Sequence, residues 1–177
     1  MNPAASALPR PIAFAEKVIE LWALAGGILL CGIVLLTAYS LFMDIVFGAP
    51  FAGDFEIVEM GVAVAVFTFL PYCQLTGANV SADLFTSNAS PRTVTFLVFL
   101  GAVIALLFST FLIWRMYYGM VDSRQYNEIT TVNGIPVWFA YVPILISLAL
   151  LALASAITMI RSAKGVPHTG GPSLGGE

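Results

Sequence analysis

Charged residues are scarce in this sequence. They make up 10% of its 177 residues, whereas hydrophobic residues make up 59%. Soluble proteins carry about 25% charged residues. A water-soluble domain of this size could not bury so much apolar surface, so the composition excludes a soluble protein and predicts an integral membrane protein.

Residues that carry catalytic or metal-binding chemistry are also nearly absent. The only histidine, His168, lies in a Gly- and Pro-rich tail, which gives no support to a metal site or to histidine-based catalysis. The only cysteines, Cys31 and Cys73, lie in hydrophobic runs without a CxxC pair, and we expect both to be buried packing residues that form no disulfide. We therefore expect no enzyme activity, catalytic residue, cofactor, metal or nucleic-acid partner.

What the chain does contain is long uncharged runs. The clearest lies between Glu59 and Asp83 and would form a helix of about 34 Å, enough to cross a hydrocarbon core of about 30 Å. Four such runs predict an all-α protein with four transmembrane helices, at about residues 21–43, 57–82, 93–114 and 135–160. We expect a single membrane domain over residues 12–164, between a flexible tail at 1–11 and a disordered tail at 165–177.

Glycine and proline mark the breaks and contacts between these helices. Gly48, Pro50 and Gly53 are expected to end the first helix, and Pro136 is suited to the first turn of the fourth. Small residues four apart allow two helices to approach closely. Candidates for such contacts are Gly26–Gly27, Gly61 with Ala65, and Ala152 with Ala156.

The basic residues are divided unequally between the two ends of the predicted helices. The end that carries both termini would hold five of the seven: Arg10, Lys17, Arg92, Arg161 and Lys164. Arg115 and Arg124 would lie at the other end. By the positive-inside rule, both termini are predicted to be cytoplasmic.

Acidic residues gather at the opposite, outer end. The first outer loop brings Asp44, Asp54, Glu56 and Glu59 together without one basic residue, and Asp122 and Glu128 follow in the second. These acids either solvate the loops and cap a helix N-terminus, or attract a complementary partner. The candidate residues for partner docking are Asp54, Glu56, Glu59, Asp122, Arg124 and Glu128.

Ionisable residues are missing from the predicted spans themselves, with Arg115 lying just past the third. Proton relays and charged-substrate pathways usually place such residues at membrane depth, although sodium can be bound by carbonyls and hydroxyls alone. This pattern favours a helical unit that assists a partner over a self-sufficient pump.

Three segments, in order, resemble a known family. They are 45–50 (IVFGAP) leading to Glu56 and Glu59, 77–84 (GANVSADL) and 134–143 (GIPVWFAYVP). The chain resembles the small four-helix membrane subunit, the DctQ type, of tripartite ATP-independent periplasmic (TRAP) transporters. It departs from the family at Asp44, near which an arginine is common, and at Asn79, where a histidine is common. These departures leave the subfamily and the substrate open.

The resemblance implies a protein of the bacterial cytoplasmic (inner) membrane and separate roles for the subunits of the transporter. The small subunit packs against a large membrane subunit that holds the sodium and substrate sites, and a periplasmic binding protein that captures an organic acid docks on the outer face. Alternatives are the small subunit of another multi-component transporter, an unrelated assembly factor or exporter, and a membrane enzyme.

Overall fold

The computed structural model describes residues 10–77 and 91–163 of the chain. Within these ranges the chain forms four helices, α1 (Arg10–Phe47), α2 (Asp54–Thr76), α4 (Pro91–Gln125) and α5 (Trp138–Ala163). Each contains a segment long and apolar enough to cross a membrane. The predicted all-α fold with four candidate membrane-spanning helices is therefore confirmed.

The helices do not begin and end where the uncharged runs do. The first already begins at Arg10 and ends at Phe47, immediately before Gly48, which has a positive φ of 67°. The second ends at Thr76, where Gly77 adopts the left-handed conformation and its N–H bonds to the carbonyl of Cys73. The predicted residues 78–82 of this span lie outside the described residues.

The connection between α4 and α5 is shorter than the sequence predicts. α4 continues through Gln125, so Asp122 and Arg124 lie in its last turn rather than in a polar loop. α5 begins at Trp138 rather than at Pro136. The reason is that Pro136 forms an isolated antiparallel bridge with Ile129, in which the N–H of Val137 bonds to the carbonyl of Glu128 (3.0 Å).

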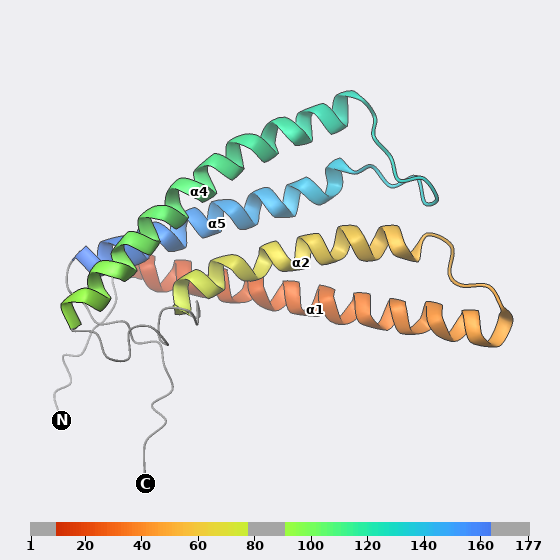
Figure 1. Cartoon of the computed structure of the whole chain (residues 1–177), viewed down its shortest axis with the longest axis horizontal. Coiled ribbons are helices and arrows are strands. Elements are labelled where there is room, and N and C mark those ends of the chain that lie inside the picture. The colour runs from red at the N-terminus through yellow and green to blue at the C-terminus, as the bar shows by residue number, and fades with distance from the viewer. Residues whose placement is uncertain (1–9, 78–90, 164–177) are drawn as a thin grey trace, which may run out of the picture.

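The four helices form a row rather than a closed bundle. α1 packs mainly on α2, α2 on α5, and α5 on α4, as Figure 1 shows. The centre of the row is α5, whose Ile144, Leu148 and Leu151 form the core. Around them pack Val64, Phe67, Leu112, Ile113 and Met116 from α2 and α4. The two inner helices of the row therefore have neighbours on two sides, and the two outer helices have neighbours on one.

Small residues allow α1 and α2 to approach closely, as predicted. A Cβ atom on Gly26 would lie 1.8 Å from Oγ1 of Thr68, and one on Gly61 would lie 2.6 Å from Cδ1 of Ile33. Ala65 is completely buried. Gly27, in contrast, has open space around it. Because no hydrophobic force drives helices together in lipid, this close van der Waals contact is what stabilises the pair.

Polar contacts join α1 to α5 as well. The indole N–H of Trp22 donates to Oγ of Ser147 (2.9 Å), and that hydroxyl donates to the carbonyl of Pro143 (2.8 Å). Nearer the helix ends, Arg161 forms an ion pair with Glu16 at 2.5 Å. The beginning of α1 and the end of α5 therefore lie at one end of the molecule, opposite the two loops at 48–53 and 126–137 (Figure 1).

Large apolar faces of the outer helices remain uncovered. On α1 they include Leu21, Leu24, Ile28, Leu35 and Phe42, and on α4 Leu100, Ile104, Leu107, Phe111 and Trp114. Cys31 belongs to this surface, so the prediction that it is buried is wrong: α1 has neighbours along one side only. Cys73 is half-buried, and both thiols are free. Ala152 and Ala156 are also only half-buried; the fully buried small residues of α5 are Ser147, Ala154 and Ser155.

The difference between Gly26 and Gly27 makes the packing of α1 on α2 testable. We expect Gly26→Leu to force the helices apart and to lower stability by about 1–3 kcal/mol, the usual cost of overpacking. Gly27→Leu is the matched control, since its side chain enters open space. Thermal unfolding of the purified protein in detergent measures both. Equal melting temperatures for the two variants would contradict the close contact.

Candidate functional site

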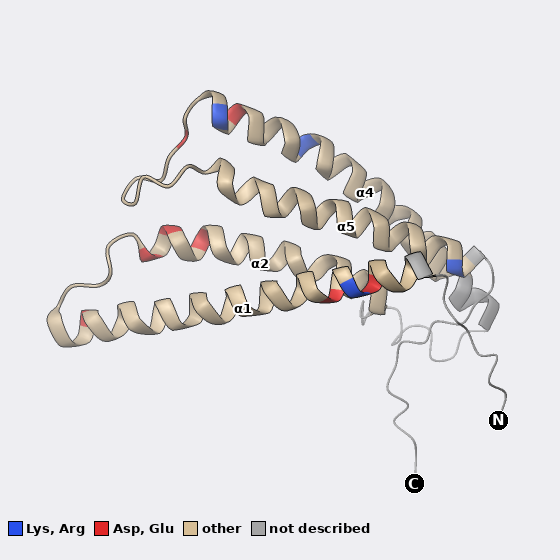
Figure 2. Ribbon diagram, turned by 180° about the vertical axis from the view of Figure 1, so that it is seen from behind, with Lys and Arg blue, Asp and Glu red and all other residues tan. Residues whose placement is uncertain are grey.

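The candidate site lies at the loop end of the molecule, where acidic side chains gather. Figure 2 shows acids at this end of α1, α2 and α4, where only α4 also carries basic residues, whereas basic and acidic residues alternate at the end where α1 begins. The loop at 48–53 connects α1 to α2, and the segment at 126–137 connects α4 to α5. Together they form what we call the outer face.

The first loop is held in place by Asp54 and Ser40. Oγ of Ser40 donates to Oδ2 of Asp54 (2.5 Å) and accepts from the N–H of Phe51 (3.2 Å). The other carboxylate oxygen, Oδ1, accepts from the N–H of Phe55 (2.7 Å) in the first turn of α2. Asp54 therefore holds the loop against α1, and its negative charge also suits a helix N-terminus.

The second loop contains a short turn of its own. Thr130 and Ile135 exchange two hydrogen bonds, from the N–H of Thr130 to the carbonyl of Ile135 (2.9 Å) and from the N–H of Ile135 to Oγ1 of Thr130 (3.0 Å). Gly134 supplies the positive φ of 63° that the turn requires. Residues 131–133 thus form the tip of a defined turn.

Glu56 joins the two loops. Its Oε1 accepts from the N–H of Val132 (2.8 Å). Its Oε2 accepts from both the N–H (3.0 Å) and the side-chain Nδ2 (3.2 Å) of Asn133, and Nδ2 also donates to the carbonyl of Gly53 (2.8 Å). We call this set of contacts the Glu56 bridge. Hydrogen bonds to a carboxylate are stronger than neutral ones, so a single side chain holds segments 76 residues apart in sequence.

The Glu56 bridge also explains why residue 53 is glycine. Its φ of 77° disfavours other residues. A Cβ atom there would also lie 2.0 Å from Nδ2 of Asn133. The sequence alone indicates Glu56 as a candidate site residue but not its partner, Asn133. The Asn133–Gly134 dipeptide signals a turn, but nothing local shows that the turn reaches α2.

The other predicted docking residues remain exposed. Glu59, Asp122 and Glu128 are exposed, and their side chains make no hydrogen bond or ion pair within the part of the chain that the structure describes. The structure thus divides the six predicted residues. Asp54 and Glu56 hold the loops, Glu59, Asp122 and Glu128 present free carboxylates, and Arg124 contacts an aromatic ring.

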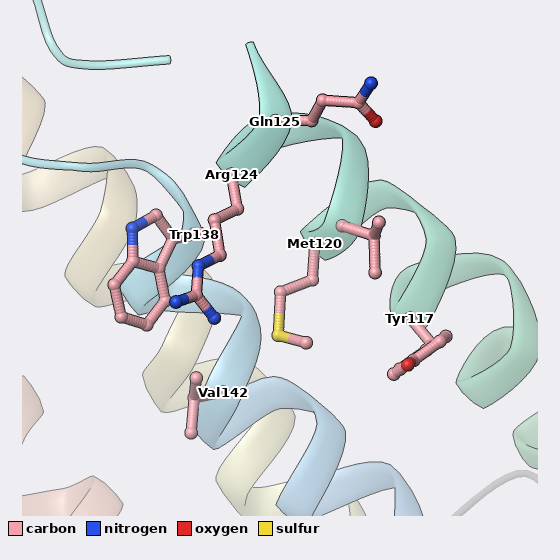
Figure 3. A pocket seen from close by; sticks show the side chains of 7 residues that line it. Tyr117, Met120, Arg124, Gln125, Trp138 and Val142 are labelled. Carbon is pink, nitrogen blue, oxygen red and sulfur yellow. The ribbon is translucent and has the colours of Figure 1, made fainter. Parts of the chain in front are cut away.

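Arg124 lines a cavity that the sequence analysis did not predict. The cavity has a volume of about 530 Å³ and lies between the ends of α4 and α5 (Figure 3). Its lining consists of Tyr117, Met120, Val121, Arg124, Gln125, Trp138 and Val142. Cζ of Arg124 lies 5.5 Å from the centroid of the Trp138 ring, within the range of a cation–π interaction. The described residues contain no group of three or more side chains suited to hold a metal ion.

Removal of the Glu56 side chain tests whether it holds the loops together. We expect Glu56→Ala to accelerate amide hydrogen exchange at Val132 and Asn133 several-fold, because both N–H groups lose their acceptor. Glu59→Ala is the matched control, one turn further along α2 and without a partner among the described residues. Equal exchange in both variants would show that the turn needs no anchor.

Comparison with known proteins gives one match. The model of the family described as "Tripartite ATP-independent periplasmic transporters, DctQ component" matches residues 33–165. The match includes α1 from Ile33 onward and all of α2, α4 and α5. No curated protein and no solved structure matches the chain. The predicted family is confirmed by a match over well more than half of the sequence: the chain belongs to the DctQ family, the small membrane component of tripartite ATP-independent periplasmic transporters.

Proposed function

We propose that this protein is a non-catalytic subunit that supports a large sodium-coupled membrane subunit and helps a periplasmic binding protein to dock for organic acid uptake. The observation that carries the proposal is the absence of ionisable groups at membrane depth. In the described helices, Asp, Glu, Lys, Arg and His are absent from residues 21–43, 60–76, 96–114 and 138–160. A coupled transporter usually needs such groups, so the coupling and substrate sites belong to the partner.

The open row of helices supports the assignment of a scaffolding role. A closed bundle would bury most of its helix surfaces, whereas here α1 and α4 each present an uncovered apolar side. Lipid covers one part of this surface, and the large subunit covers another. The close α1–α2 contact and the core around α5 keep the unit rigid while the partner moves.

The orientation in the membrane follows from charge. The end of the molecule with Arg10 and Arg161 faces the cytoplasm by the positive-inside rule, together with both termini. The outer face then points to the periplasm of a bacterium, where a binding protein would meet it.

On the outer face, the three exposed carboxylates are the best placed to meet a partner. Glu59 lies on α2, Asp122 on α4 and Glu128 in the second loop. Because the Glu56 bridge holds the two loops together, these charges have a defined spacing. Such a surface favours a partner with basic residues and raises its association rate.

The support role predicts no transport by this chain alone. Reconstituted into liposomes with a sodium gradient, a binding protein and radiolabelled organic acids, it should give no uptake, because its spans lack coupling groups. Co-purification with a large membrane subunit of the transporter should succeed, and addition of that subunit should allow uptake. Uptake by the isolated chain would overturn the proposal, as would stable isolation of an active large subunit without it.

The docking role predicts a change in association kinetics. In the assembled transporter we expect the triple variant Glu59→Gln, Asp122→Asn, Glu128→Gln to bind the binding protein on the order of threefold to tenfold more slowly, with a weaker dependence on salt. Glu20→Gln, an exposed acid near the beginning of α1, is the control. Stopped-flow association at several salt concentrations measures both. Unchanged rates in a correctly assembled triple variant would exclude these acids from docking.

A further inference from the structure

The cavity between α4 and α5 has one cationic end and one apolar side. At the cationic end, the guanidinium of Arg124 lies over the ring of Trp138 and points toward the cavity in Figure 3. Met120, Val121 and Val142 provide the apolar side. A site of this kind suits an amphipathic molecule with a negative head and an apolar body.

The surroundings of the cationic end favour an anion. None of the seven lining residues is acidic. Asp122, the acid nearest to Arg124 in sequence, is two residues from both Met120 and Arg124, which places it about 200° from each of them around α4, although it is only three residues from the lining residue Gln125. Trp138 is the first residue of α5, and the first turn of this helix contains no acidic residue. The partial positive charge at the N-terminus of α5 is therefore not balanced by a carboxylate from the same helix.

The position of the cavity along the helices matches the border of a bilayer. The uncharged run of α4 ends at Trp114 and that of α5 begins at Trp138, so the cavity, lined by α4 residues after Trp114 and by Trp138 and Val142, lies at the same end of both runs. Tryptophan, tyrosine and arginine are typical of this border. From Trp138 to Val142 the cavity extends about 6 Å along α5, from the level of lipid headgroups toward that of acyl chains.

We propose that this cavity binds an anionic phospholipid of the outer leaflet, with its phosphodiester at Arg124 and the upper part of an acyl chain along Met120, Val121 and Val142. The guanidinium offers a fork of N–H donors that fits two phosphate oxygens. Because the lining contains no carboxylate to accept an ammonium group, the site favours phosphatidylglycerol over phosphatidylethanolamine. Its volume of about 530 Å³ is sufficient for a headgroup and the adjoining glycerol.

The test measures lipid retention by the full-length protein. Phosphatidylglycerol and phosphatidylcholine are added separately to protein in an uncharged detergent, and native mass spectrometry counts the lipids that remain bound. We expect one phosphatidylglycerol to remain and Arg124→Gln to weaken its retention about tenfold. Arg115→Gln is the matched control, because it removes the same charge from the same helix outside the cavity. Met120→Trp fills the apolar side with Arg124 intact and should also expel the lipid.

Three outcomes would overturn the proposal. Equal retention of the two lipids would exclude recognition of the anionic head. Equal loss in Arg124→Gln and Arg115→Gln would mean that the lipid is attracted by charge alone. If both cavity variants retain the lipid but Arg124→Gln prevents assembly with the large subunit, the cavity receives an acidic side chain of that partner. If Arg124→Gln does not fold, the Met120→Trp variant provides the test, and retention of phosphatidylglycerol by that variant would then overturn the proposal.

Discussion

The structure depends first on a constraint set by the bilayer. Hydrocarbon offers no partner for a backbone N–H or carbonyl, so each crossing segment must satisfy its own polar groups as a helix. The same solvent removes the hydrophobic force between helices, and close contact has to replace it. Gly26 against Thr68 and Gly61 against Ile33 are such contacts. α5 is the helix most stabilised by such contacts. It packs against both α2 and α4, and it also forms a hydrogen bond with Trp22 and an ion pair with Glu16 of α1.

Outside the hydrocarbon, water surrounds the chain, and hydrogen bonds of polar side chains fix the conformation of the loops. Water competes for every hydrogen bond there, so a loop keeps its shape only where several bonds act together. The carboxylate of Glu56 meets this condition with three donors from Val132 and Asn133. A residue that could have served only to attract a partner instead gives the outer face its shape, while its neighbour Glu59 remains free.

The family match and the structure describe complementary parts of the function. The match assigns the chain to the small membrane component of a tripartite transporter. Three features of the structure support the supporting role that we propose for it: its central uncharged runs, the open row of its helices and the joining of its loops. The cavity beside Arg124 is lined by residues of α4 and α5 alone.

The sequence by itself determined the number of spanning segments, the helix break near Gly48 and the family, because hydropathy, turn chemistry and motifs are local properties. It also identified Gly26, Gly61 and Ala65 as contact residues, since small side chains are what close approach needs. Only the tertiary structure decided which helices are neighbours, and therefore that Cys31 is exposed. It alone paired Glu56 with Asn133 and Arg124 with Trp138, since these contacts join separate segments whose relative position depends on the packing of all four helices.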